Sequence, residues 1–183
     1  MAHELLLAGF GGQGVMSMGM IITYAGMIEG KRVSWIPSYG PEQRGGTANC
    51  SVVVSDRAIG SPVVTEPDTL VAMNLPSLDR FEQAVKPGGI IVVNTSLIKR
   101  KVARTDVRVV DIDATALADE MGNQRIANMI VLGAVIGLTR VVGMDAVKKS
   151  LCKVFPPHRR NLIPANETAL DKGLDLARAA PGA

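Results

Sequence analysis

A glycine-rich segment near the N-terminus has the spacing of a turn that binds phosphate. Residues 9–14 read GFGGQG, which matches G-x-G-x-x-G, and they follow a short apolar stretch. We expect Gly9 to permit a tight turn. We expect Gly11 and Gly12 to let backbone N–H groups approach a phosphate at the positive N-terminus of a helix. The candidate cofactor-binding residues are therefore Gly9, Gly11, Gly12, Gln13 and Gly14.

The same segment lacks the partners that two common phosphate sites require. A nicotinamide dinucleotide site needs an Asp or Glu about 20 residues beyond the glycines, to hold the ribose hydroxyl. That region reads WIPS at residues 35–38, with Glu29 before it and Glu42 well past it. A Walker A loop needs Lys and then Ser or Thr after its last glycine, and Val15 follows Gly14. Two interpretations stay open: the turn binds another phosphate-bearing ligand, or its glycines only permit close packing on a strand or on another subunit.

A second segment, at residues 37–50, places polar side chains beside glycines. Binding residues concentrate on loops of this kind. An arginine followed by two glycines, as at Arg44, suits a bidentate grip on a carboxylate or phosphate; alternatively, it pairs with Glu42 and stiffens the loop. The candidate substrate or interface residues are Tyr39, Glu42, Arg44, Gly45, Gly46 and Asn49.

Residue types that usually carry catalysis or bind metals are scarce. Cys50 and Cys152 lie far apart, with no second thiol or histidine at ligand spacing, so we expect no zinc or iron–sulfur site. The two histidines, His3 and His158, lie in terminal segments, and we expect His158 on a surface loop. We therefore expect no catalytic residue and no metal site on this chain, and no activity from the chain alone.

Length and composition limit the class of protein. A chain of 183 residues suits one domain, which we expect over residues 1–183 with a loose tail at 180–183. The net charge is +3 and the longest basic stretch is KRK at residues 99–101, which argues against a nucleic-acid surface. No apolar stretch reaches the roughly 18 residues of a membrane span, and no secretory leader is recognisable. We expect a cytoplasmic protein without nucleic-acid or membrane partners.

The pattern of apolar residues predicts strands that alternate with helices. Expected strands lie at residues 4–8, 31–36, 47–55, 69–73, 89–94 and 107–112, with a loop at 37–46. Expected helices lie at residues 12–28, 75–85, 114–121, 126–142, 144–155 and 168–179, with Asp113 as the N-cap of the third. This alternation predicts a three-layer α/β/α, Rossmann-like domain with a mostly parallel sheet and an antiparallel β-excursion near residues 47–64.

Three motifs that follow one another along the chain resemble a known family. GFGGQG at residues 9–14, PSYGPEQRGG at 37–46 and NTS at 94–96 are similar to the gamma subunits of the 2-oxoacid:ferredoxin oxidoreductases. The resemblance continues to the helix that opens at Asn128. Within that family, Phe10 and the stretch GGTANC at residues 45–50 are most similar to the 2-oxoglutarate and branched-chain members.

The resemblance implies a subunit of a thiamine-diphosphate enzyme. Such an enzyme oxidatively decarboxylates a 2-oxoacid, transfers the acyl group to coenzyme A and reduces ferredoxin. The resemblance places thiamine diphosphate and the iron–sulfur clusters on partner subunits, namely the alpha, beta and delta subunits, with ferredoxin reached through the complex. We assign no cofactor to this chain alone; coenzyme A is the candidate ligand, and a homodimer is a candidate form of the isolated chain.

Three hypotheses follow for the role of the chain. In the first, it completes an active site at a subunit interface, and the glycine turn, the 39–46 loop or both touch coenzyme A. In the second, it is a structural and assembly module whose glycines pack against partner subunits. In the third, which rests on the G-x-G-x-x-G match alone, it is a stand-alone nicotinamide-binding reductase.

Overall fold

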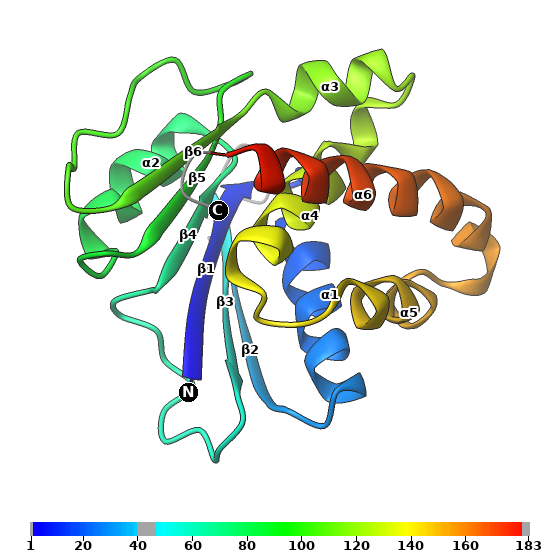
Figure 1. The fold of residues 1–183 in the computed structure, drawn as a ribbon, viewed down its shortest axis with the longest axis horizontal. Helices are drawn as coiled ribbons and strands as arrows, with labels where there is room; N and C mark the ends of the chain where they lie inside the picture. The colour runs from blue at the N-terminus through cyan, green and yellow to red at the C-terminus, as the bar shows by residue number, and fades with distance from the viewer. Residues whose placement is uncertain (1, 40–46, 181–183) are drawn as a thin grey trace.

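Six strands form one mixed sheet in the computed structural model, which describes residues 2–39 and 47–180. The strands are β1 Ala2–Phe10, β2 Arg32–Tyr39, β3 Thr47–Ser55, β4 Thr69–Ala72, β5 Ile90–Asn94 and β6 Arg108–Ile112. Their order across the sheet is β2-β3-β1-β4-β5-β6 (Figure 1). β1, β4, β5 and β6 pair in parallel, whereas β3 runs antiparallel to both β1 and β2. The predicted α/β fold with a mostly parallel sheet is confirmed.

Two details of the sheet differ from the sequence expectation. β2 continues through Pro37 to Tyr39, where the sequence predicts a loop. Pro37 is tolerated because β2 is an edge strand, where the missing N–H can face away from the ladder. The antiparallel excursion predicted near residues 47–64 ends at Ser55, and residues 56–68 contain no helix or strand. β2 and β3 thus form an antiparallel pair that places β3 directly beside β1.

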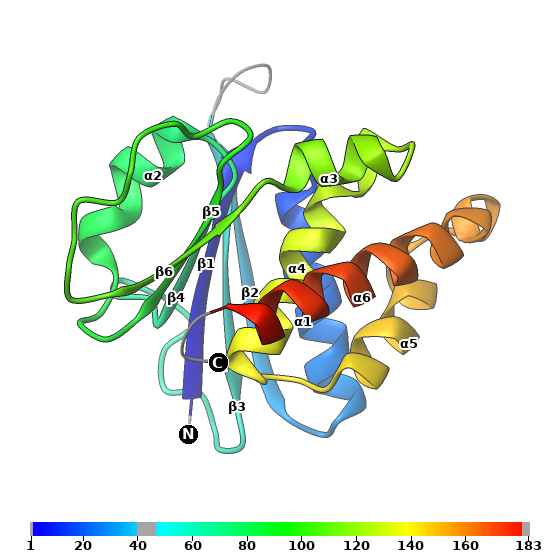
Figure 2. The ribbon, with the colours of Figure 1, turned by 45° about the horizontal axis from the view of Figure 1, so that its top comes forward.

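Helices cover both faces of the sheet (Figures 1 and 2). On one face, α1 and α4 pack against the strands, α5 packs outside α1, and α6 packs outside α4, which adds a helical layer to the three that the sequence predicts. α2 lies on the opposite face with the short 3₁₀ helix η1. The helices are α1 Val15–Ile28, α2 Leu75–Phe81, η1 Glu82–Ala84, α3 Ala114–Glu120, η2 Gln124–Ile126, α4 Ala127–Thr139, α5 Met144–Val154, η3 Pro157–Leu162 and α6 Ile163–Ala179. Within the described ranges, no helix has the length and apolarity needed to cross a membrane.

The direction of the chain connections reverses between β1 and β4. From β1 the chain passes through α1 to β2, on one side of the sheet, and from β4 it passes through α2 to β5, on the other. In an open α/β sheet, this reversal leaves a crevice outside the carboxyl ends of the two strands. The glycine turn after β1 lies at this crevice, because β1 ends at Phe10.

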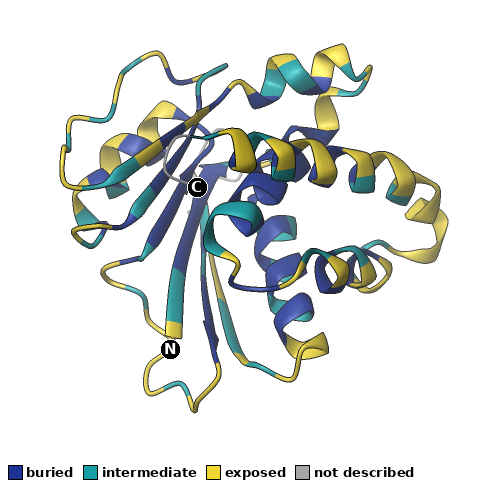
Figure 3. Cartoon of the chain, in the orientation of Figure 1, coloured by how far each residue is buried: buried dark blue, intermediate teal, exposed yellow. Residues whose placement is uncertain are grey.

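Side chains of the central strands alternate between two cores. Leu5 and Leu7 face the larger core beneath α1 and α4, whereas Leu6 faces the smaller core beneath α2. All three side chains are buried, and Figure 3 shows the same burial along the central strands and α4. Continuous apolar runs such as these are typical of strands that are covered on both faces.

Ser96 fixes the segment after β5 to the start of α3. The backbone N–H groups of Thr115 and Ala116 donate to Ser96 Oγ at 2.9 and 3.3 Å, and the Ser96 hydroxyl donates to the Asp113 carboxylate. Asp113 is the N-cap residue of α3, as the sequence predicts, but its side chain makes no capping hydrogen bond to the helix. Asp113 orients Ser96 instead, and Ser96 satisfies the N–H groups at the start of the helix.

Glycines allow α6 to cross α4 at backbone distance. A Cβ added to Gly133 of α4 would lie 2.1 Å from the carbonyl oxygen of Leu170, and one added to Gly173 of α6 would lie 1.9 Å from that of Ile130. Since real Cβ atoms do not approach oxygens this closely, only glycine fits at both positions. The contact buries α4 between the sheet and α6, and residues 127–136 are all buried.

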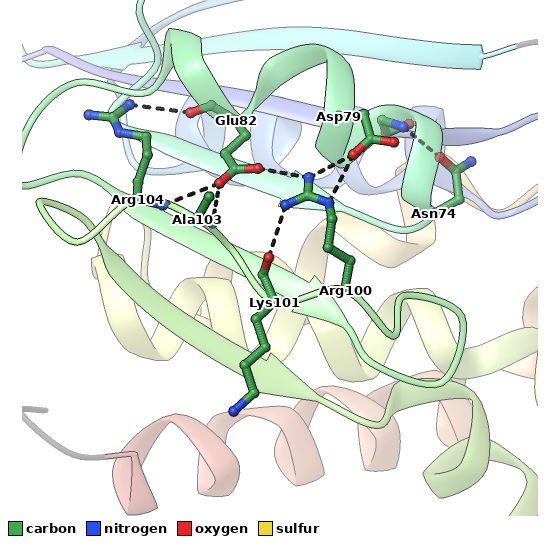
Figure 4. Close-up of polar contacts among 8 residues, drawn as sticks. Asn74, Asp79, Glu82, Arg100, Lys101, Ala103 and Arg104 are labelled. Atoms are coloured by element: carbon green, nitrogen blue, oxygen red, sulfur yellow. Dashed lines mark hydrogen bonds and ion pairs between the residues drawn. The ribbon is translucent and has the colours of Figure 1, made fainter.

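A polar network ties the segment after β5 to α2 on the opposite face (Figure 4). The carboxylate of Glu82, only 3% exposed, accepts hydrogen bonds from Arg100 Nη2 at 2.7 Å and from the backbone N–H of Ala103 at 2.5 Å. Arg100 also pairs with Asp79 at 2.7 Å. Burial disfavours the charged form of Glu82, but the hydrogen bonds from Arg100 and the backbone outweigh it, so the pKa of Glu82 lies below its ordinary value.

Replacing Gly173 with Ala should lower the free energy of unfolding by about 3 kcal/mol, because the added methyl overlaps the Ile130 carbonyl and forces α6 away from α4. Gly60→Ala is the matched control, since a Cβ there would meet nothing within 4 Å. Urea unfolding followed by circular dichroism measures both. Equal unfolding midpoints for the two variants would contradict the close helix contact.

Replacing Glu82 with Gln should lower the free energy of unfolding at pH 7 by about 2 kcal/mol, because hydrogen bonds to a buried carboxylate are lost. The pKa of Glu82 is lower in the folded chain, so its stabilisation is complete above the unfolded value near 4.5 and is lost as the pH falls through the folded value. The difference in the free energy of unfolding between Glu82→Gln and wild type should therefore shrink as the pH falls below about 4.5. Unfolding curves from pH 7 to pH 3 test this, with the exposed Glu120→Gln as control. A difference in unfolding free energy that stays constant from pH 7 to pH 3 would contradict stabilisation by the charged Glu82 carboxylate.

Candidate functional site

A cleft of about 790 Å³ opens at the carboxyl edge of the sheet, at the crevice between β1 and β4. Its walls come from the turn after β1, the ends of β4 and β5, the first turn of α3, the junction of η2 with α4, and η3 with the start of α6. The glycine turn contributes Gly12, Gln13 and Gly14 to these walls. The volume and the position are those of ligand sites in α/β proteins.

Two glycines shape the turn that borders the cleft. Gly12 and Gly14 have φ angles of +94° and +74°, in the left-handed region that favours glycine, and Gly14 is the N-cap of α1. A Cβ added to Gly12 would meet nothing within 4 Å, whereas one added to Gly14 would lie 2.1 Å from Nδ2 of Asn128. Gly12 therefore leaves its backbone open to the cleft, and Gly14 lets α1 meet α4. Gly11 is exposed in the same turn.

Gln13 closes the turn with its side chain. Its Oε1 accepts hydrogen bonds from the Phe10 backbone N–H at 2.7 Å and from Asn74 Nδ2 at 3.3 Å, and its Nε2 donates to the Met73 carbonyl at 3.3 Å. Both ends of the carboxamide are thus engaged within the chain. Gln13, predicted to bind a cofactor, holds the ends of β1 and β4 together.

Gly9 has a different structural role from the tight turn that the sequence predicts. It lies within β1, not in the tight turn, and its φ is not in the left-handed region. A Cβ there would lie 2.7 Å from Gln13 Oε1 and 2.9 Å from the Met73 Cβ. Gly9 is therefore needed for the close approach of the turn to the end of β4, which is a packing requirement.

The cleft has a positive electrostatic character. The start of α1 has no acidic residue in its first turn and no side-chain cap, so N–H groups at its positive end remain available to an anion. α4 also begins at the cleft, and its first turn has no acidic residue. Arg125 and Arg159 line the cleft, while no Asp or Glu is among the described residues that line it. An anionic ligand therefore suits this site.

Some cations elsewhere in the described chain are paired, whereas the two arginines of the cleft are not. At the amino edge of the sheet, Lys86 Nζ lies 2.8 Å from Glu4 and 2.9 Å from Asp68. Arg125 and Arg159 are exposed, and across residues 2–39 and 47–180 neither guanidinium has a hydrogen-bond or ion-pair partner. Their donors are free to bind phosphate or carboxylate.

The second predicted motif is described only at its flanks. Tyr39 ends β2, and Asn49, which is half-buried in β3, lies opposite Ala8 of β1. Thr47 pairs with Phe10 in the register, so the strand ends that flank this motif lie beside the glycine turn. Both motifs therefore reach the same edge of the sheet. Glu42, Arg44, Gly45 and Gly46 lie outside the described residues, as do residues 181–183 of the expected tail.

Comparison with known families gives this arrangement a context. The model of the pyruvate ferredoxin/flavodoxin oxidoreductase family matches residues 4–176, which is nearly the whole chain. The chain belongs to this family. A crystal structure of the keto/oxoacid ferredoxin oxidoreductase gamma subunit from Geobacter sulfurreducens superimposes with a TM-score of 0.83 at 28% identity, over 97% of this chain and 99% of that one. The resemblance to gamma subunits is confirmed.

Two longer relatives carry different substrate names. Ketoisovalerate oxidoreductase subunit VorA of Methanothermobacter marburgensis is 40% identical over 94% of this chain, which spans only 36% of that protein. The 2-oxoglutarate:ferredoxin oxidoreductase from Magnetococcus marinus, solved with 2-oxoglutarate, coenzyme A and succinyl-CoA, superimposes with a TM-score of 0.89 at 26% identity, over 100% of this chain and 32% of that one. In both comparisons, this chain corresponds to about a third of the relative.

The sheet of this family member differs from a nicotinamide-binding sheet. In that class, the second strand lies beside the first, and its acidic end residue reaches the ribose. Here β3 occupies the place next to β1, and β2 lies one strand farther out. Because β2 also ends without an acid, at Tyr39, the G-x-G-x-x-G match does not extend to the rest of a nicotinamide site.

The cysteines and histidines lie away from the cleft walls. Cys50 is buried beneath α1, and burial raises its pKa to about 12, which keeps it a neutral thiol. Cys152 is exposed on α5, and His158 is exposed in η3. His3 is at the amino edge, where Nε2 lies 2.9 Å from Thr69 Oγ1. Within the described residues, no three His, Cys, Asp or Glu side chains form a group that could hold a metal ion.

Sequence reasoning missed several cleft residues. Asn94, at the end of β5, could have been found, because polar residues that directly follow buried parallel strands gather at the carboxyl edge. Arg125, Asn128 and Arg159 could not, because η2, α4 and η3 reach the cleft through tertiary packing, such as the hydrogen bond from Asn128 Nδ2 to the Gly14 carbonyl.

Replacing Gln13 with Ala should lower the free energy of unfolding by about 2 kcal/mol and speed hydrogen exchange at the Phe10 amide, because that N–H loses its acceptor. Gln83→Ala, which removes an exposed carboxamide, is the control and should change neither quantity. Amide exchange followed by NMR gives the residue-level result. Unchanged protection of Phe10 in Gln13→Ala would show that the side chain does not hold the turn.

Proposed function

We propose that this chain acts as the gamma component of a thiamine-diphosphate-dependent 2-oxoacid:ferredoxin oxidoreductase, and that its carboxyl-edge cleft binds the anionic part of coenzyme A. The observation that supports this most directly is the cleft itself, where the positive end of α1 and two unpaired arginines line a space without a described carboxylate. Coenzyme A carries a pyrophosphate and a further phosphate, so it needs several cationic or N–H donors at once.

The reaction needs groups that other subunits would supply. A 2-oxoacid and coenzyme A yield an acyl-CoA, carbon dioxide, a proton and two electrons, and two oxidised ferredoxins accept the electrons. The described residues of this chain do not form the ligand set of an iron–sulfur cluster, since Cys50 is a buried neutral thiol and Cys152 lies alone on α5. The proposed contribution of this chain is to bind and orient coenzyme A, and it should be inactive by itself.

The 2-oxoacid is proposed at the level of two classes. The motifs around Phe10 and residues 45–50 favour 2-oxoglutarate or a branched-chain 2-oxoacid, and the Magnetococcus enzyme is a 2-oxoglutarate enzyme, whereas the Methanothermobacter relative is a ketoisovalerate oxidoreductase subunit. We favour 2-oxoglutarate. An assay of the native complex with viologen dye, coenzyme A and a panel of 2-oxoacids separates the two classes.

Replacing Arg125 or Arg159 with Ala in the assembled complex should raise the KM for coenzyme A about tenfold, because each loses a charge-assisted hydrogen bond to phosphate. The KM for the 2-oxoacid should not change. Arg178→Ala is the matched control, since its side chain is 71% exposed near the far end of α6.

The outcome separates binding from assembly. If the variants prevent co-purification of the complex while the complex that survives keeps its KM for coenzyme A, the cleft is an assembly surface. An unchanged KM in an intact complex also contradicts the binding role. Arg44→Ala extends the same test to the second motif.

A further inference from the structure

A buried polar atom at the cleft has no hydrogen-bond partner among the described residues. Asn94, the last residue of β5, is 0% exposed and lines the cleft. Its Nδ2 donates to Thr115 Oγ1 at 3.3 Å, but its Oδ1 accepts no hydrogen bond from any described residue. Asn94 therefore presents an unsatisfied acceptor at the wall of a site with unpaired cations.

This arrangement is unfavourable for folding alone. A buried carbonyl oxygen without a donor loses its hydration and gains nothing in return, so such atoms are rare and call for an explanation. A leucine has nearly the same size and would avoid the loss. Asn74 shows the ordinary arrangement, because its Oδ1 accepts from the Ser77 N–H at 2.9 Å and caps α2. Asn94 has no such structural task for its oxygen.

We propose that Asn94 is a ligand-contact residue whose carboxamide oxygen accepts a hydrogen bond from an amide N–H or hydroxyl group of the molecule bound in the cleft. The proposal rests on the proposed function, in which Arg125 and Arg159 bind the anionic groups of the ligand. Asn94 would accept a hydrogen bond from an uncharged donor group of the same ligand. Coenzyme A has both kinds of donor, on its pantetheine amides and its hydroxyls.

The two kinds of contact recognise different features of the ligand. The arginines and the start of α1 recognise charge, which many anions share. Asn94 selects among anions, because a buried acceptor that a ligand leaves unpaired disfavours that ligand. Because Asn94 is covered in the free chain, contact with a ligand requires movement of the adjoining wall, which includes the 49% exposed Leu97.

The test is Asn94→Leu in the assembled complex, with stability and binding measured on the same preparation. Thermal unfolding should show a stability close to that of wild type, because removal of the unpaired acceptor offsets the loss of the Nδ2 hydrogen bond to Thr115. The Kd for coenzyme A, measured by calorimetry, should rise about tenfold. Binding of sulfate, an anion without a hydrogen-bond donor, should not change when followed by NMR shifts of the Gly12 amide.

Two controls separate this proposal from the proposed function. Arg125→Ala should weaken both coenzyme A and sulfate, and Gln83→Leu, which replaces an exposed carboxamide, should weaken neither. If Asn94→Leu is less stable than wild type but binds coenzyme A with unchanged affinity, Asn94 has only a structural role. In that case only this proposal fails. Equal losses of coenzyme A and sulfate affinity in Asn94→Leu would also overturn it. If wild type binds no coenzyme A, the proposed function fails and this proposal fails with it.

Discussion

The carboxamide of Gln13 joins the ends of β1 and β4. After these two strands the chain continues toward opposite edges of the sheet. Through the carboxamide, the Phe10 N–H at the end of β1 and the Met73 carbonyl after β4 are held by one side chain. The contact requires Gly9, because a Cβ there would collide with Gln13 and Met73. With the turn fixed, α1 begins directly after its N-cap Gly14 and directs its N-terminus into the crevice between β1 and β4. The position of the cleft depends on this arrangement.

Much of the fold could be predicted from the sequence because its signals are local. The apolar run before Gly9 and the glycine stop at Gly30 mark β1 and α1 within a few residues. The place of β3 between β1 and β2 could not be predicted, since strand order follows from long-range pairing and leaves little local mark. Asp113 is the N-cap residue of α3 as predicted, but the hydrogen bonds from Ser96 to the start of α3 could not be predicted, because Ser96 lies in a distant part of the sequence.

The residues of the cleft could be predicted only in part, because some of them reach it through long-range packing. Its glycines are recognisable by spacing, and Gly12 and Gly14 adopt the left-handed conformation that makes glycine necessary. Gln13 is a candidate because it lies within the glycine motif, and in the structure its carboxamide bonds to other residues of the chain. Arg125 and Arg159 belong to no motif, and tertiary packing brings them to the cleft that the glycine turn also lines.

The family membership and the cleft support one account. A gamma-type domain, whose described residues form no metal-binding cluster, provides a positively charged site at the sheet reversal, which is where we propose that coenzyme A binds. Its central claim concerns the place of binding, and hydrogen exchange of the assembled complex with and without coenzyme A tests it most directly. The account predicts slower exchange in residues 10–17 and 123–129 and no change at the amino edge around Glu4, Asp68 and Lys86. Unchanged exchange at the cleft with bound coenzyme A, or protection confined to the amino edge, would contradict it.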